Sequence, residues 1–190
     1  MAGLLDETDL VVKHRPKLLE RRIGYDVYGS QDNILGSVVQ VGRDNLEKTL
    51  HPQRSDNAQT AFEMSDATGG VVLQLTHLQA LRSSLVVGNA AGSEVGRIHL
   101  EKILGKSRFD FEVDGARVGA MNAATWRKRR FLILDGAGDE IAGIDMTRGS
   151  SGDHAHHNEY AVHIHRHLED PLRALTVAAV IAVDMILWER

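Results

Sequence analysis

Apolar and polar residues alternate through the middle of the chain in five segments of similar design. Each segment has an alternating stretch, a turn rich in Gly, Asp or Asn, and a second apolar stretch, which is typical of a β-hairpin. Gly recurs just after an apolar residue in the second stretch, at Gly36, Gly96, Gly119 and Gly143. Because Gly weakens a strand, this recurrence predicts a bend or a close backbone approach. The five predicted hairpins are Tyr25–Val38, Phe62–Leu75, Leu85–Ile98, Phe109–Met121 and Phe131–Ile144.

Two further apolar segments flank the hairpins. Leu10–His14 (LVVKH) predicts an opening strand, and Tyr160–His167 (YAVHIHRH) predicts a closing strand. The total is about twelve antiparallel strands, which is enough to close a barrel and remove exposed sheet edges. The polar segment Arg43–Thr60 carries a proline and shows no period, so we expect a loop or a short helix across one end of the barrel.

The C-terminal part of the chain departs from the strand pattern. Glu169-Asp170-Pro171 indicates a helix start, and Leu172–Trp188 (LRALTVAAVIAVDMILW) is apolar on every face, so it must be buried in protein or in lipid. Its 17 residues span about 25 Å, which is short of the ~20 residues of a usual membrane crossing. Asp184 favours burial in protein, because hydrocarbon offers a carboxylate no partner. We therefore expect a helix inside the barrel, with a C-terminal membrane anchor as the alternative.

Length and composition fit one globular domain over residues 1–190. The chain is 43% hydrophobic and 25% charged, and its net charge of −4 argues against a nucleic-acid partner. The absence of Cys excludes a disulfide scaffold, a thiol nucleophile and a Cys-ligated zinc site. The first residues contain no apolar run of the kind that a secretory signal needs, so we expect a cytoplasmic protein, with peripheral membrane contact as an option.

The chain resembles phospholipid scramblases and LURP-one-related proteins, which belong to the tubby C-terminal-like superfamily. The ending AVDMILWE (Ala182–Glu189) follows an apolar helix and a strand YAVHI, and the opening VVKHRPKLLERRIGYDVYGSQDNILGSV and the repeated hairpins also match. The resemblance implies a mainly β fold, a twelve-stranded antiparallel closed barrel that encloses the hydrophobic C-terminal helix. Residues 172–188 would be that central helix.

The calcium motif of the scramblases is altered in this chain. Aligned on Tyr160, the acids expected at the first, third and last places are His156, Asn158 and His167, and only Glu159 remains. Calcium prefers anionic oxygen ligands, so this segment does not favour a calcium-triggered activity. The Cys-rich palmitoylation segment and the Pro-rich tail of scramblases are also missing.

A basic run lies between the fourth and fifth hairpins and includes a tryptophan. Guanidinium groups bind phosphate oxygens, and an indole suits a membrane interface. By analogy with tubby-type domains, we take this run as the candidate site for an anionic lipid headgroup, with a solvated basic loop as the alternative. The candidate residues are Trp126, Arg127, Lys128, Arg129 and Arg130.

Histidines are concentrated between His154 and His167. The period of a strand places His163, His165 and His167 on one face, and neighbouring imidazoles can share zinc or another transition metal. The alternatives are a pH-sensing patch and a solvated outer face of the strand.

Motifs of common enzymes are missing from the sequence, which contains no GxSxG, GxxxxGK[ST] or HExxH. We expect a non-enzymatic barrel that binds an anionic lipid headgroup, a small ligand or a protein partner and needs no resident cofactor. A metal-binding or pH-sensing module built on the His154–His167 cluster is the second hypothesis. Phospholipid scrambling would need a membrane-spanning path, which a buried helix does not supply.

Overall fold

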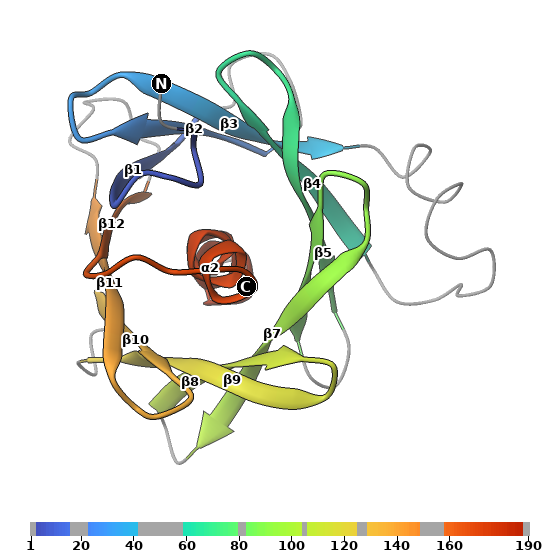
Figure 1. Ribbon diagram of the computed structural model, residues 1–190, viewed down its shortest axis with the longest axis vertical. Coiled ribbons are helices and arrows are strands. Elements are labelled where there is room, and N and C mark those ends of the chain that lie inside the picture. Colours follow the sequence, from blue (N-terminus) through green and yellow to red (C-terminus); the bar gives the residue numbers. More distant parts are fainter. Residues whose placement is uncertain are drawn as a thin grey trace.

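Twelve antiparallel strands form a closed barrel around one helix (Figure 1). The computed structural model describes residues 3–15, 23–41, 59–79, 83–103, 106–124, 129–148 and 158–187. Each strand pairs with its neighbours in the chain, and β1 pairs with β12 to close the barrel. The elements are β1 (Asp9–His14), β2 (Gly24–Gly29), β3 (Ile34–Val41), β4 (Gln59–Asp66), β5 (Val71–Leu78), β6 (Ser84–Asn89), β7 (Glu94–Ile103), β8 (Lys106–Val113), β9 (Ala116–Ala123), β10 (Arg130–Asp135), β11 (Glu140–Arg148), β12 (Asn158–Ile164) and α2 (Leu172–Leu187).

The predicted fold class is confirmed, the predicted hairpins are a few residues longer in the structure, and two other segments also differ. Most of the segment predicted as a loop or short helix, Arg43–Thr60, lies outside the described residues, and its last two residues belong to β4. The closing strand ends at Ile164, before His165 and His167. The chain must leave the barrel wall at this point to reach the central helix, as Figure 1 shows.

All five hairpin turns lie at the same end of the barrel, which we call the turn end; we call the opposite end the connection end. The tightest turn is Asp114-Gly115, where both residues have positive φ (49° and 77°), as its sequence predicts. Three longer turns share a side-chain device, in which Asp66, Asn89 or Asp135 accepts hydrogen bonds from two backbone N–H groups of its own turn. A repeated acid or amide therefore fixes these turns locally.

Every hairpin contains a β-bulge next to its turn, and the bulge explains three of the four recurring glycines. In the first hairpin Val27 pairs with Gly36 and Tyr28 pairs with Ile34, so Leu35 is the extra residue. Bulges bend a strand and increase its twist, which helps a sheet to close. In three hairpins the residue after the bulge is a glycine that closely approaches the neighbouring backbone. The extra residues of the five hairpins are Leu35, Val72, Val95, Val118 and Ile141.

The prediction of a close backbone approach is correct at three of the glycines and wrong at Gly143. A Cβ on Gly36, Gly96 or Gly119 would lie 2.1, 2.7 or 2.6 Å from a carbonyl oxygen of the next strand. At Gly143 the nearest atom would be the Phe131 carbonyl oxygen of the preceding strand, 3.8 Å away. The pairing register gives the reason, because Ile133 pairs with Ala142, so Ala142 and not Gly143 follows the bulge in the fifth hairpin.

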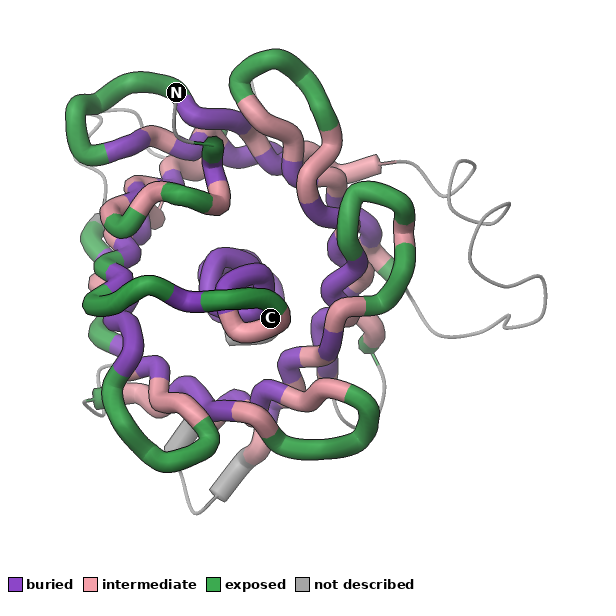
Figure 2. The backbone as a smooth tube through the Cα atoms, in the orientation of Figure 1, coloured by how far each residue is buried: buried purple, intermediate pink, exposed green. Residues whose placement is uncertain are grey.

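The helix α2 lies at the centre of the barrel (Figure 2). Inward-facing strand residues alternate with outward ones, and the helix residues from Arg173 to Met185 are all buried. The slim alanines Ala174, Ala178, Ala179 and Ala182 let the helix fit inside the wall. Among the residues that the structure describes, no helix has both the length and the hydropathy of a membrane-spanning segment.

Candidate functional site

Arg129 and Arg130 are exposed at the connection end, where β10 begins. The Arg130 carbonyl accepts a hydrogen bond from Ala124 N–H at 2.8 Å, and the Arg129 carbonyl accepts one from Met146 N–H at 2.7 Å. These backbone bonds tie both residues to β9 and β11 and leave their side chains in solvent. The other members of the predicted lipid-binding run, Trp126, Arg127 and Lys128, lie outside the described residues.

The charges of these two arginines are only weakly balanced by the protein. Arg130 Nε lies 3.8 Å from Asp145 Oδ1, and the two side chains are 58% and 44% exposed. Within the part of the chain that the structure describes, no carboxylate forms an ion pair with Arg129. A pair as exposed as Arg130–Asp145 is worth little in water, so both guanidinium groups are available to an external anion.

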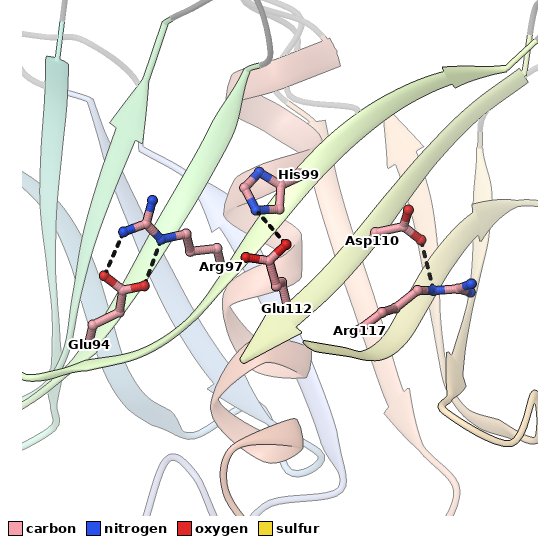
Figure 3. A network of polar contacts seen from close by, with 6 residues as sticks. All are labelled: Glu94, Arg97, His99, Asp110, Glu112 and Arg117. Carbon is pink, nitrogen blue, oxygen red and sulfur yellow. Dashed lines mark hydrogen bonds and ion pairs between the residues drawn. The ribbon is translucent and has the colours of Figure 1, made fainter. Parts of the chain in front are cut away.

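The outer face of β7, β8 and β9 is different, because its charges are paired (Figure 3). Arg97 donates to both carboxylate oxygens of Glu94, at 2.6 and 2.9 Å, and this contact lowers the pKa of Glu94. Arg117 Nε lies 3.0 Å from Asp110, and His99 Nε2 lies 3.7 Å from Glu112. Charges that are already paired on a solvated face offer little to a ligand, so this network provides control residues for the arginines at the connection end.

The three candidate metal ligands are exposed but do not converge on one point. His163 Nδ1 contacts Asp9 Oδ1 at 2.7 Å, and His165 Nδ1 lies 3.6 Å from Glu140. The hydrogen bond with His163 is the main cause of the lowered pKa of Asp9. In the described part of the chain, no three His, Asp or Glu side chains are gathered for a metal ion. His154, His156 and His157 lie outside it, so the metal and pH-sensing hypotheses stay predictions.

Asp184 has partners that the sequence did not indicate. Inside the barrel its Oδ2 accepts a hydrogen bond from the Tyr25 hydroxyl at 2.5 Å, and its Oδ1 accepts one from the Tyr160 hydroxyl. Burial, reinforced by the Asp184 charge, raises the pKa of Tyr160 well above its ordinary value, so this hydroxyl remains a donor. The cluster connects α2 to β2 and β12, and we assign it a structural role.

A buried histidine near the connection end gives a pH prediction. His77 is 2% exposed, its Nε2 lies 2.8 Å from Ser83 Oγ, and burial lowers its pKa below the ordinary 6.5. The unfolded chain therefore binds the proton more readily, and stability is expected to fall as pH drops below 6.5, with a slope of at most about 1.4 kcal/mol per pH unit. Urea unfolding between pH 7.5 and 5.5 measures this loss.

The matched variants for this experiment are His77→Leu and His167→Leu. The first removes the buried imidazole and is expected to flatten the pH dependence, whereas the second removes an exposed one and should leave most of it. Equal slopes in wild type and His77→Leu would contradict the assignment to His77.

The strand pairing and the enclosed helix define a closed antiparallel barrel with a central helix. A protein from Arabidopsis thaliana, solved by X-ray crystallography, aligns over 98% of this chain and 97% of its own with 13% identity and a TM-score of 0.49. A porin-like protein from Bacteroides uniformis aligns over 83% of this chain and 96% of its own with 9% identity and a TM-score of 0.23. No protein-family model matches the sequence, and no curated protein matches it either. Similarity at this level assigns no function, and the fold rests on the strand pairing itself.

Proposed function

We propose that this chain is a non-catalytic binding protein of the tubby C-terminal-like superfamily, related to scramblases and LURP-one-related proteins, whose connection end contacts an anionic lipid surface. The observation that supports it best is the pair of exposed arginines at that end, Arg129 and Arg130, one weakly paired and the other without a described carboxylate partner. Guanidinium groups form paired hydrogen bonds with phosphate oxygens. The neighbouring sequence Trp126-Arg127-Lys128 would extend the same contact.

The charge distribution of the described residues also favours this orientation. Carboxylates gather at the turn end, which an anionic surface would repel. An approaching membrane would therefore meet the connection end first. The acidic residues at or next to the turn end include Asp6, Glu7, Asp32, Asp66, Asp114, Asp135, Asp139, Glu140, Glu169 and Asp170.

Because side chains fill the interior of the barrel, we place the lipid contact at one end of the barrel and not inside it. Apolar side chains of α2 and of the strands occupy the centre, so a large ligand has no room beside the helix. The proposal therefore includes no catalytic residue and no cofactor. It names a peripheral surface contact whose strength depends on charge.

Vesicle flotation tests the proposal. The protein is mixed with neutral phosphatidylcholine vesicles or with vesicles that contain phosphatidylserine, over a series of salt concentrations. We expect binding to the anionic vesicles only, and release by salt. Because a basic residue near an anionic surface contributes about 1 kcal/mol, Arg129→Ala/Arg130→Ala is expected to lower the partition coefficient about 30-fold.

The control is Arg97→Ala/Arg117→Ala, which makes the same change in net charge on the paired outer face. It should keep most of the binding. Equal losses in the two double variants would mean that only net charge matters, and the assigned surface would be wrong. Binding that survives high salt and an alkaline wash would instead indicate an inserted helix and would contradict burial of α2.

A further inference from the structure

Arg173 is a buried cation near the start of α2, at the turn end of the barrel. The residue is 8% exposed, and its Nη1 donates a long hydrogen bond of 3.4 Å to the Leu168 carbonyl. Its Nε and Nη2 atoms are buried and, among the described residues, have no hydrogen-bond partner. Burial of a charged group without a partner is unfavourable, so an anion bound to this guanidinium would stabilise the folded protein.

The two unpaired atoms form one edge of the guanidinium group. Nε–H and Nη2–H point in parallel directions, which is the arrangement that receives two oxygens of a single oxyanion. Thr176 Oγ1 is also buried and has no partner among the described residues. Residues three apart share a helix face, so Thr176 lies on the same side of α2 as Arg173, one turn further along the helix.

The backbone N–H groups of Arg173 and Ala174 already have hydrogen-bond partners. Arg173 N–H donates to the Glu169 carbonyl at 3.1 Å, and Ala174 N–H donates to Asp170 Oδ1 at 3.3 Å. The helix dipole adds positive potential, but the direct ligands would be the side chains of Arg173 and Thr176. Glu169 and Asp170 are exposed, and neither forms an ion pair with Arg173.

We propose that Arg173 and Thr176 form a binding site for the carboxylate group of a small organic acid, at the turn end of the barrel. A carboxylate presents two oxygens to the guanidinium edge and carries one negative charge. The exposed carboxylates of Glu169 and Asp170 disfavour a dianion such as phosphate more strongly than a monoanion. This site lies at the opposite end from Arg129 and Arg130 and does not depend on the proposed lipid contact.

Thermal unfolding with formate as the probe tests the site. Sodium formate replaces sodium chloride at constant ionic strength, so that charge screening stays the same. Ligand binding to the folded state raises Tm, and a hundredfold excess of formate over Kd is expected to raise it by about 5–10 °C. Phosphate at the same ionic strength should give a smaller rise.

Three variants test whether the formate-dependent rise in Tm comes from this site. Arg173→Met keeps most of the side-chain volume and should abolish the formate-dependent rise, whereas Arg117→Met removes an exposed arginine and should keep it. Thr176→Val preserves the shape of the core and should raise the half-saturating formate concentration about 5–10-fold, as expected for loss of one hydrogen bond. In wild type, the NMR signal of Arg173 Nε–H should shift with formate and saturate, which provides a readout if Arg173→Met fails to fold.

Several results would overturn the proposal. They are the absence of a formate-dependent rise in wild type, an equal rise in Arg173→Met, and a larger rise with phosphate than with formate. An Arg173 Nε–H signal that formate does not move would also overturn it. So would an experimental structure in which the side chain of Glu169 or Asp170 occupies the free edge of Arg173.

Discussion

Deletion of residues 172–190 is expected to leave a chain that does not fold. Among the side chains of α2 that the structure describes, six large apolar ones are almost fully buried, namely Leu175, Val177, Val180, Ile181, Val183 and Met185. Burial of each contributes about 1.5–3 kcal/mol, so together they contribute about 9–18 kcal/mol. A domain has a total stability of about 5–15 kcal/mol, so the barrel wall cannot compensate for the loss. Circular dichroism and solubility of the truncated chain measure the outcome.

Two further variants make this prediction specific. Removal of residues 188–190 alone spares the residues of α2 that are described as buried, from Arg173 to Met185, and should leave the fold intact. Val180→Asp places a charge at a fully buried position and should reproduce much of the damage in the full-length chain. If the deleted chain were soluble, with a cooperative thermal transition, the central helix would not be part of the core.

Gly36→Ala is expected to destabilise the fold by about 3 kcal/mol, at the upper end for overpacking. The new methyl group would lie 2.1 Å from the Ser65 carbonyl oxygen and 2.6 Å from Leu4 Cδ1. Relief of the first contact requires movement of the β4 backbone, which is bonded to β3 along its length. Urea unfolding of the variant gives the change in free energy.

Gly143→Ala is the matched control for this substitution. It makes the same chemical change in a strand, but its new methyl group would meet Phe131 O at an ordinary 3.8 Å. We expect a change within ~0.5 kcal/mol, and slight stabilisation is consistent with the lower entropy of the unfolded chain. Similar losses in the two variants would mean that glycine is needed for flexibility and not for close packing.

The hairpins were predictable because each repeats a local signal, whereas their register was not. The period of two locates a strand, but a bulge adds one residue without changing the overall pattern. A comparison of the five hairpins by sequence alone therefore places Gly143 at the position after the bulge, which Ala142 occupies in the structure. The useful signal is a pair of consecutive inward-facing positions before the alternation resumes, as in Leu35-Gly36 and Ile141-Ala142.

The candidate sites were less predictable because they depend on three-dimensional neighbours. The exposure of Arg129 and Arg130 follows from a charged run between two strands, which a sequence displays directly. The partners of Asp184, by contrast, come from β2, more than 150 residues earlier, and from β12. Arginine is usually exposed, so the sequence alone would place Arg173 on the surface. It is buried because the chain turns into the barrel just before α2.

The position of α2 after all twelve strands has a consequence for synthesis in the cell. A ribosome releases the strands first, and for much of translation their apolar inner faces lack the helix that covers them. Closure of the barrel also waits for β12 to meet β1, which is made before the other eleven strands. The nascent strands are therefore a natural client for chaperones until β12 closes the ring and α2 fills the core.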